Sequence, residues 1–181
     1  NCDLSLERTN VVFGSGNPKA AIMIIGEGPG EQEDLSGKPF IGRSGKLLTQ
    51  LLTCAGINRE LDTFIANTVK CRPPKNRTPY PSEIDSCKEY LTRQIQLIQP
   101  RILLLLGAPS LKSILDKKLA ITKVRGQWFK KSVDYMEKEL IIMPLFHPSY
   151  LLRFAAKKTG SPRDLTEQDL KEVKQQLDNL I

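Results

Sequence analysis

The chain has 181 residues, of which 40% are hydrophobic, and a formal net charge of +7. A disordered chain would be less apolar, and no apolar run approaches the roughly 20 residues that a membrane span requires. Residues 101–181 carry almost all of the excess positive charge. We therefore expect one soluble domain over residues 1–181, with no membrane partner. Its charge either serves solubility alone or, as we favour, binds a polyanion such as nucleic acid.

Short apolar runs alternate with amphipathic stretches along the chain, which is the pattern of an α/β protein. Each predicted strand is a brief run that ends at Gly, Pro or a charged residue, and each predicted helix has apolar residues at helical spacing. We predict a three-layer α/β/α sandwich around a four-stranded parallel sheet, with a ligand site at the carboxyl ends of the strands. The predicted strands are residues 20–25, 63–69, 101–106 and 140–145, and the predicted helices are residues 45–55, 81–98, a stretch from Pro109, and 165–180, with a hairpin at 124–138.

A glycine-rich loop follows the first predicted strand. Gly26, Gly28 and Gly30 stand within five residues, so the backbone can approach a ligand closely and expose its N–H groups. The loop is not a phosphate-binding P-loop, because it lacks the Gly-Lys-Ser/Thr ending and residues 26–34 include four acidic side chains. It therefore predicts either a ligand-binding loop of another kind or a tight surface turn.

Polar residues follow two further predicted strands. Asn67 lies at the end of the second strand, and its amide can donate and accept hydrogen bonds side by side, as the edge of a base requires. His147, the only histidine of the chain, follows the fourth strand and precedes the rigid Pro148. Either residue alone is more often structural. Both, however, stand at the sheet edge of the glycine-rich loop, where a donor to a ligand oxygen would be useful.

Taken in order, these segments resemble the family 4 uracil-DNA glycosylases, the iron–sulfur branch of the uracil-DNA glycosylase superfamily. Each motif is a modest signal, but the ordered set is specific and covers nearly the whole chain. The resemblance implies the three-layer sandwich and a DNA repair enzyme that flips uracil out of DNA and hydrolyses its N-glycosidic bond, leaving an abasic site and free uracil. The matching segments are residues 2–4, 8–14, 26–30, 38–45, 67–74 and 147–153.

The resemblance also implies which residues hold the base. Phe40 would stack on the uracil ring, and Asn67 would pair with its polar edge and so refuse cytosine. Glu33 would occupy the space into which the methyl group of thymine projects. The pocket would be lined by the backbone of Gly26, Gly28 and Gly30.

Catalysis is expected to depend on stabilising the negative charge of the departing uracil. By resemblance, His147 and the Asn67 amide would stabilise this anion in a water-poor site. Gly28 stands where family 1 enzymes carry an Asp, so Glu27 is the nearest carboxylate that could activate the water. A dissociative cleavage would need little help from such a base.

Four cysteines and no secretory signal at the N-terminus favour a cytoplasmic protein that binds metal over one with disulfides. The family holds a [4Fe-4S] cluster, and by resemblance Cys2, Cys71 and Cys87 are three of its ligands. The fourth cysteine is expected two residues before Asn1, in a trimmed N-terminal segment. Cys54, on the apolar face of a predicted helix, is expected to be a buried core thiol. A zinc site and a loop that holds no metal stay open as alternatives.

The loop after His147 is expected to open the DNA. Leu151 is predicted to be the wedge that fills the space left by the flipped base, with Arg153 on a flanking phosphate and Lys157 and Lys158 extending the positive surface. The alternative is that the leucines of this loop begin a helix and face the core. We expect the protein to act as a monomer on uracil-containing DNA.

Two other functions fit the sequence less well. The first is a weakly active or inactive uracil-DNA-binding relative, or a thiolate-metal module that only binds nucleic acid. The presence of Phe40, Asn67 and His147 argues against it. The second is the branch that becomes covalently trapped on uracil-DNA through a histidine in an insertion after the second motif. Residues 71–77 run on without such an insertion.

Overall fold

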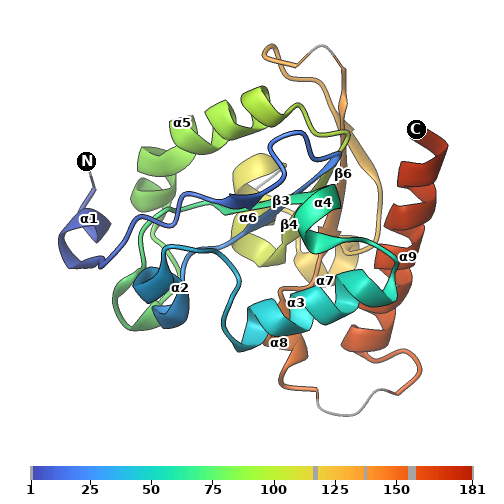
Figure 1. The fold of residues 1–181 in the computed structure, drawn as a ribbon, viewed down its shortest axis with the longest axis horizontal. Coiled ribbons are helices and arrows are strands. Elements are labelled where there is room, and N and C mark those ends of the chain that lie inside the picture. Colours follow the sequence, from blue (N-terminus) through green and yellow to red (C-terminus); the bar gives the residue numbers. More distant parts are fainter. Residues whose placement is uncertain (1, 116–117, 137, 155–157, 181) are drawn as a thin grey trace.

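A six-stranded sheet forms the centre of the computed structural model, which describes residues 2–115, 118–136, 138–154 and 158–180 (Figure 1). The strand order is β1-β3-β2-β4-β6-β5. The four central strands run parallel, with helices on both faces, so the predicted fold class is confirmed. These strands are β2 (Ile22–Gly26), β3 (Thr63–Asn67), β4 (Ile102–Leu106) and β6 (Leu140–Leu145).

Two short antiparallel strands extend the sheet at its edges and raise the strand count above the predicted four. At one edge, β1 (Ser15–Gly16) pairs with β3. At the other edge, β5 (Phe129–Lys131) pairs with β6 and lies within the segment predicted as a hairpin. Strands of two or three residues are too short to show an alternating pattern, which is why the sequence did not reveal them as strands.

The central strands are buried on both faces. In β2, Ile22 and Ile24 face one apolar cluster, whereas Met23 and Ile25 face the other. This division follows from the two-residue period of a strand, and it explains why β2 and β4 read as continuous apolar runs.

Helices cover the two faces of the sheet, and the four long ones correspond to the predicted helices. α3 and α9 contribute to the first apolar cluster, and α5 contributes to the second. The remaining helices are too short for a helical period to be visible in the sequence. The long helices are α3 (Arg43–Cys54), α5 (Pro81–Ile98), α6 (Gly107–Ile114) and α9 (Pro162–Leu180), and the short ones are α1 (Leu4–Glu7), α2 (Glu31–Ser36), α4 (Arg59–Asp62), α7 (Ile121–Val124) and α8 (Pro148–Leu151), with a 3₁₀ turn at Pro74–Asn76.

The register of the parallel strands brings their carboxyl ends together. Gly26 of β2 stands opposite Asn67 of β3, and Leu106 of β4 stands opposite Leu145 of β6. The connection from β2 to β3 runs through α3 on one face, and the connection from β3 to β4 crosses back through α5 on the other (Figure 1). Ligands of α/β sheets bind where connections diverge in this way. Among the described residues, no helix is both long and apolar enough to cross a bilayer.

Candidate active site

A pocket of about 270 Å³ opens at the carboxyl edge of the sheet. Its walls come from the loops that follow β2, β3 and β6 and from the turn that leads into α3, so segments far apart in sequence meet there. The sequence-predicted residues that line it are Glu27, Gly28, Gly30, Glu33, Phe40, Asn67 and His147.

Gly26 lies directly against two of these side chains. A Cβ atom built on Gly26 would stand 2.5 Å from Asn67 Oδ1 and 2.5 Å from the Phe40 ring. Real Cβ atoms do not approach other atoms so closely, so any other residue at this position would displace both side chains. The last residue of β2 must therefore be glycine for the pocket to keep this shape.

Asn67 is buried at the end of β3, with 1% of its surface exposed. Its amide oxygen Oδ1 is buried and has no hydrogen-bond partner among the described residues. Its backbone carbonyl accepts a 2.8 Å hydrogen bond from Lys70 Nζ, which also donates to Gln94 Oε1 at 2.6 Å. Since buried polar atoms are almost always paired, the unpaired Oδ1 of a pocket-lining residue is an acceptor available to a ligand donor.

Phe40 places its ring between Gly26 and His147. The Phe40 and His147 ring centroids are 5.7 Å apart and tilted by 39°. The backbone φ of Phe40 is +51°, in the left-handed region that side chains other than glycine and asparagine rarely adopt. Gly45 of α3 permits this turn, because a Cβ atom there would lie 1.9 Å from the Phe40 carbonyl oxygen.

The carboxylate of Glu33 is buried beside Phe40 and satisfied by backbone donors. Its Oε1 accepts the N–H groups of Ile41 at 2.9 Å and Gly42 at 2.8 Å, and its Oε2 accepts the N–H of Gly30 at 3.1 Å. These bonds tie the glycine-rich loop to the turn that carries Phe40. Glu33 therefore shapes the pocket in addition to bordering it.

Glu27 is a half-buried carboxyl group in the pocket wall. Burial raises the pKa of Glu27 above its ordinary value, and a hydrogen bond with Thr78 opposes the shift. A raised pKa makes a carboxylate a stronger proton acceptor, as a water-activating group requires.

The His147 ring is held by the first turn of α8. Its Nδ1 accepts the Ser149 backbone N–H at 3.2 Å and lies 2.8 Å from Ser149 Oγ. Because Nδ1 accepts a backbone N–H, the proton of the neutral ring resides on Nε2, which leaves a donor for a ligand. Burial lowers the pKa of His147 to about 4, although the carboxylate of Glu33 acts in the opposite direction. The ring is therefore neutral at pH 7.

A second cavity, of about 730 Å³, adjoins the first and shares Glu27 and Pro79 with it. It lies between α5, α6 and the end of β5, and apolar residues of these elements form much of its wall. Asn67, Phe40 and His147 are not among its lining residues. The smaller pocket therefore holds the convergent polar groups that chemistry requires.

The structure brings the three cysteines assigned to metal binding into one cluster. Cys71 and Cys87 are buried, and Cys2 packs against them together with Leu4 and Val69. Arg8 Nη1 donates a hydrogen bond to Cys71 Sγ at 3.0 Å. Over the described part of the chain, no three His, Cys, Asp or Glu side chains lie close enough together to hold a single metal ion, whereas the thiols of an iron–sulfur cluster stand further apart because each binds a different iron.

Cys54 lies outside this cluster. The prediction that it is a buried core thiol is wrong, because the structure places Cys54 on the exposed side of α3. The buried stripe of α3 includes Leu51 and Leu52 and continues at Ala55, so Cys54 stands beside the stripe and not within it.

The prediction that Leu151 projects from its loop as a wedge is also wrong. Leu151 is 1% exposed and packs in the cluster beneath α3 and α9, because it ends the single turn of α8 on the inward side. Leu152 and Phe154 each expose 38% of their surface instead. Arg153 and Lys158 are exposed, whereas Lys157 lies outside the described residues.

Arg77 was not singled out in the sequence, yet it lines the pocket. It forms a bidentate ion pair with Glu83, at 2.9 and 2.6 Å, and its guanidinium carbon lies 3.8 Å from the centre of the Tyr80 ring. Glu83 also accepts the Tyr80 N–H at 2.7 Å, at the start of α5. The sequence signal that could have pointed to this arrangement is Glu83 in the first turn of the helix that opens at Pro81, where a carboxylate is favoured by the exposed N–H groups.

The chain is similar to known proteins over most of its length. A family model described as the uracil DNA glycosylase superfamily matches residues 13–171. A type-4 uracil-DNA glycosylase of Thermotoga maritima is 48% identical over 96% of this chain and 86% of its own length. Proteins of the same name from Sulfurisphaera tokodaii and Saccharolobus solfataricus are 45% and 46% identical, over 96% and 97% of this chain and 78% and 80% of their own lengths.

The chain belongs to the type-4 uracil-DNA glycosylases. The match spans the glycine-rich loop, Asn67 and His147, so the pocket described above lies within the part of the chain that the family shares.

The protonation of His147 can be measured directly, because it is the only histidine of the chain. We expect its ring signals in a proton NMR titration to stay constant from pH 8 to pH 5 and to shift only around pH 4, since burial disfavours the cation. The same signals in denaturant should titrate near the ordinary value of about 6.5. A folded-state midpoint above pH 6 would contradict the lowered pKa that burial gives to this ring.

Proposed function

We propose that this protein is a uracil-DNA glycosylase that binds a flipped uracil in the smaller pocket and hydrolyses its bond to deoxyribose. The unpaired, buried Oδ1 of Asn67, opposite Gly26 and beside Phe40, is the observation that carries the proposal. We take one chain as the working unit. Free uracil and an abasic site are the products.

Uracil fits the polar groups of this pocket. Its N3–H donor and O4 acceptor stand side by side, and the Asn67 amide offers an acceptor and a donor in the same arrangement. Cytosine presents an acceptor at N3 and a donor at N4, which the same amide orientation would refuse. The Phe40 ring supplies the stacking surface, and the Glu33 carboxylate fills the space that the methyl group of thymine would need.

The reaction breaks the bond between C1′ of the sugar and N1 of uracil. The electron pair of that bond leaves with the base, so negative charge develops on the ring and its O2 atom. The neutral His147 ring donates from Nε2 to O2, and the Asn67 amide binds the opposite edge of the same ring. Such preorganised donors lower the barrier because they need not reorient as charge develops.

Water completes the reaction by adding to C1′ and giving up a proton. Glu27 is a carboxylate of the pocket wall that, unlike Glu33, is not engaged by three backbone N–H groups, and its raised pKa suits it to accept that proton. The uracil anion takes up a proton after it leaves. Because the cleavage is dissociative, loss of Glu27 should cost less than loss of His147 or Asn67.

The glycosylase activity is tested with a labelled oligonucleotide that contains one uracil, followed by alkali to cleave abasic sites. We expect the unaltered protein to produce scission at the uracil, and Asn67→Ala or His147→Ala to slow single-turnover release by roughly 10²- to 10³-fold, because each removes a contact to the leaving group. Melting temperature and affinity for DNA should change little. Unaltered rates in both variants would exclude these residues from the mechanism.

We further propose that Cys2, Cys71 and Cys87 bind a [4Fe-4S] cluster whose fourth ligand is the cysteine expected before Asn1. The shared packing of the three thiols and the Arg8 hydrogen bond to Cys71 Sγ support this set, because a cationic donor stabilises a metal-bound thiolate. The cluster would supply structural cross-linking. No step of the reaction passes through it.

The identity of the metal is tested by expressing the protein with its natural N-terminus. We expect about four irons per chain and a brown colour. Cys71→Ala and Cys87→Ala should lose iron and melt at lower temperature, because each removes a ligand. Cys54→Ala is the matched control. It should keep its iron and its melting temperature, since Cys54 is exposed and lies outside the cluster of thiols. If the purified protein contained zinc and no iron, a zinc site would replace the iron–sulfur cluster as the assignment.

The loop after α8 is proposed to contact the DNA. Leu152 is the first exposed large apolar residue after His147 in the sequence, so we assign it the wedge role first expected of Leu151. Arg153 and Lys158 lie exposed on the same segment and suit phosphate contacts. The DNA that this surface would bind is the uracil-containing substrate.

The wedge is tested by comparing duplex and single-stranded substrates. Leu152→Ala should slow excision from duplex DNA several-fold more than from single strands, because only the duplex leaves a gap to fill when the base flips. Leu151→Ala is the matched control and should lower the melting temperature instead, since it removes a buried side chain. An equal effect of Leu152→Ala on both substrates would exclude the wedge role.

A further inference from the structure

The ring of Phe40 is held by a strained backbone. A φ of +51° in a residue other than glycine is unfavourable, and it persists only where the surroundings fix the peptide groups on both sides. The φ angle depends on the orientation of the peptide between Pro39 and Phe40, and the ψ angle depends on the peptide between Phe40 and Ile41. Whatever holds these two peptides determines where the ring points.

The peptide after Phe40 is held by an anion. The N–H of Ile41 donates to Glu33 Oε1 at 2.9 Å, and the next N–H, of Gly42, donates to the same oxygen at 2.8 Å. Glu33 is 8% exposed, so water competes little for these bonds.

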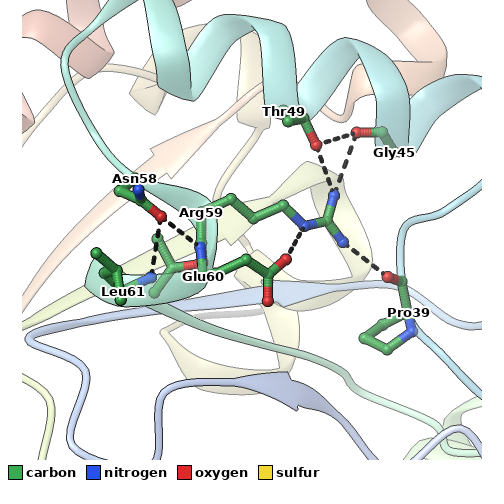
Figure 2. Close-up of polar contacts among 8 residues, drawn as sticks. Pro39, Gly45, Thr49, Asn58, Arg59, Glu60 and Leu61 are labelled. Atoms are coloured by element: carbon green, nitrogen blue, oxygen red, sulfur yellow. Dashed lines mark hydrogen bonds and ion pairs between the residues drawn. The ribbon is translucent and has the colours of Figure 1, made fainter.

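The peptide before Phe40 is held by a cation, as Figure 2 shows. Arg59 Nη2 donates to the carbonyl oxygen of Pro39 at 2.9 Å. Arg59 Nη1 donates to Thr49 Oγ1 at 2.8 Å, and Thr49 Oγ1 in turn donates to the Gly45 carbonyl at 3.1 Å. The guanidinium thus joins the turn before Phe40 to α3. The same turn also contacts α3 directly, at Gly45.

Arg59 is itself held in place from the other side. It begins α4, where Asn58 Oδ1 accepts the N–H groups of Glu60 at 2.9 Å and Leu61 at 3.1 Å (Figure 2). Only 15% of its side chain is exposed. Burial lowers the pKa of Arg59, but the pKa of a guanidinium lies so far above 7 that the group stays charged. α4 leads directly into β3, whose far end carries Asn67.

We infer that Arg59 is a positioning residue, which fixes the Pro39–Phe40 peptide and so holds the Phe40 ring at the angle needed to stack on the base. Arg59 and Glu33 act as a pair of opposite charges on the two peptides that flank one strained residue. The inference rests on the proposed function, because it takes uracil as the partner of the ring. Arg59 acts on the substrate only through Phe40.

A double-mutant cycle tests this coupling. Single-turnover uracil release is measured for the unaltered protein, Arg59→Met, Phe40→Leu and the double variant. We expect Arg59→Met alone to slow release by about tenfold, since small misplacements of positioning groups are costly. In the Phe40→Leu background the same change should add less than twofold. Arg59→Lys, which can still donate to one carbonyl, should recover part of the rate, and Arg93→Met, at an exposed arginine on α5, should have no effect.

A second measurement does not depend on activity. Fluorophenylalanine is incorporated at the six phenylalanines, and the Phe40 signal is identified by its loss in Phe40→Leu. We expect Arg59→Met to shift or broaden this ¹⁹F signal, and Arg93→Met to leave it in place. Strictly additive kinetic losses, or an unchanged Phe40 signal in Arg59→Met, would overturn the inference. If the unaltered protein released no uracil, the proposed function would fail, and the ¹⁹F spectra alone would decide the role of Arg59.

Discussion

The pocket depends on a close approach at the end of β2, where Gly26 leaves room for two side chains from other parts of the chain. Asn67 and Phe40 both occupy the space that a Cβ atom of residue 26 would need. Gly26 and Asn67 also stand opposite each other in the parallel register of β2 and β3. The amide proposed to read the base is therefore located by the hydrogen bonding of the sheet itself and not by a loop.

The charged side chains described in the pocket wall near Phe40 and Arg77 are paired, so the donor that we propose for the developing anion is an uncharged one. The Glu33 carboxylate is engaged by three backbone N–H groups, and the Arg77 guanidinium is paired with Glu83. His147 is neutral because of burial, and its tautomer leaves Nε2–H as the donor. A neutral donor can bind uracil before cleavage without attracting Glu33 away from the turn that it holds. The same donor strengthens its hydrogen bond as charge builds on the base.

Regular features of this fold were predictable from the sequence, whereas features set by contacts between distant residues were not. The four parallel strands are visible because burial on both faces makes each a short, mainly apolar run. Leu151 and Leu152 are chemically alike and adjacent, so only the phase of a four-residue helix decides which one is buried. Arg59 lies 20 residues from Pro39 and has no pattern around it that signals a role. The prediction that Cys54 is buried was wrong because this residue, at the end of α3, lies beside the apolar stripe of the helix.

The segment between Cys71 and Cys87 connects the thiol cluster to the pocket. Pro73, Arg77 and Pro79 of this segment line the pocket. Arg77 is paired with Glu83, which lies one helical turn before Cys87 on α5. A shift of α5 relative to Cys71 would therefore carry Glu83, and with it Arg77, out of the pocket wall. The positions of the two thiols are therefore linked to the pocket wall through α5, Glu83 and Arg77.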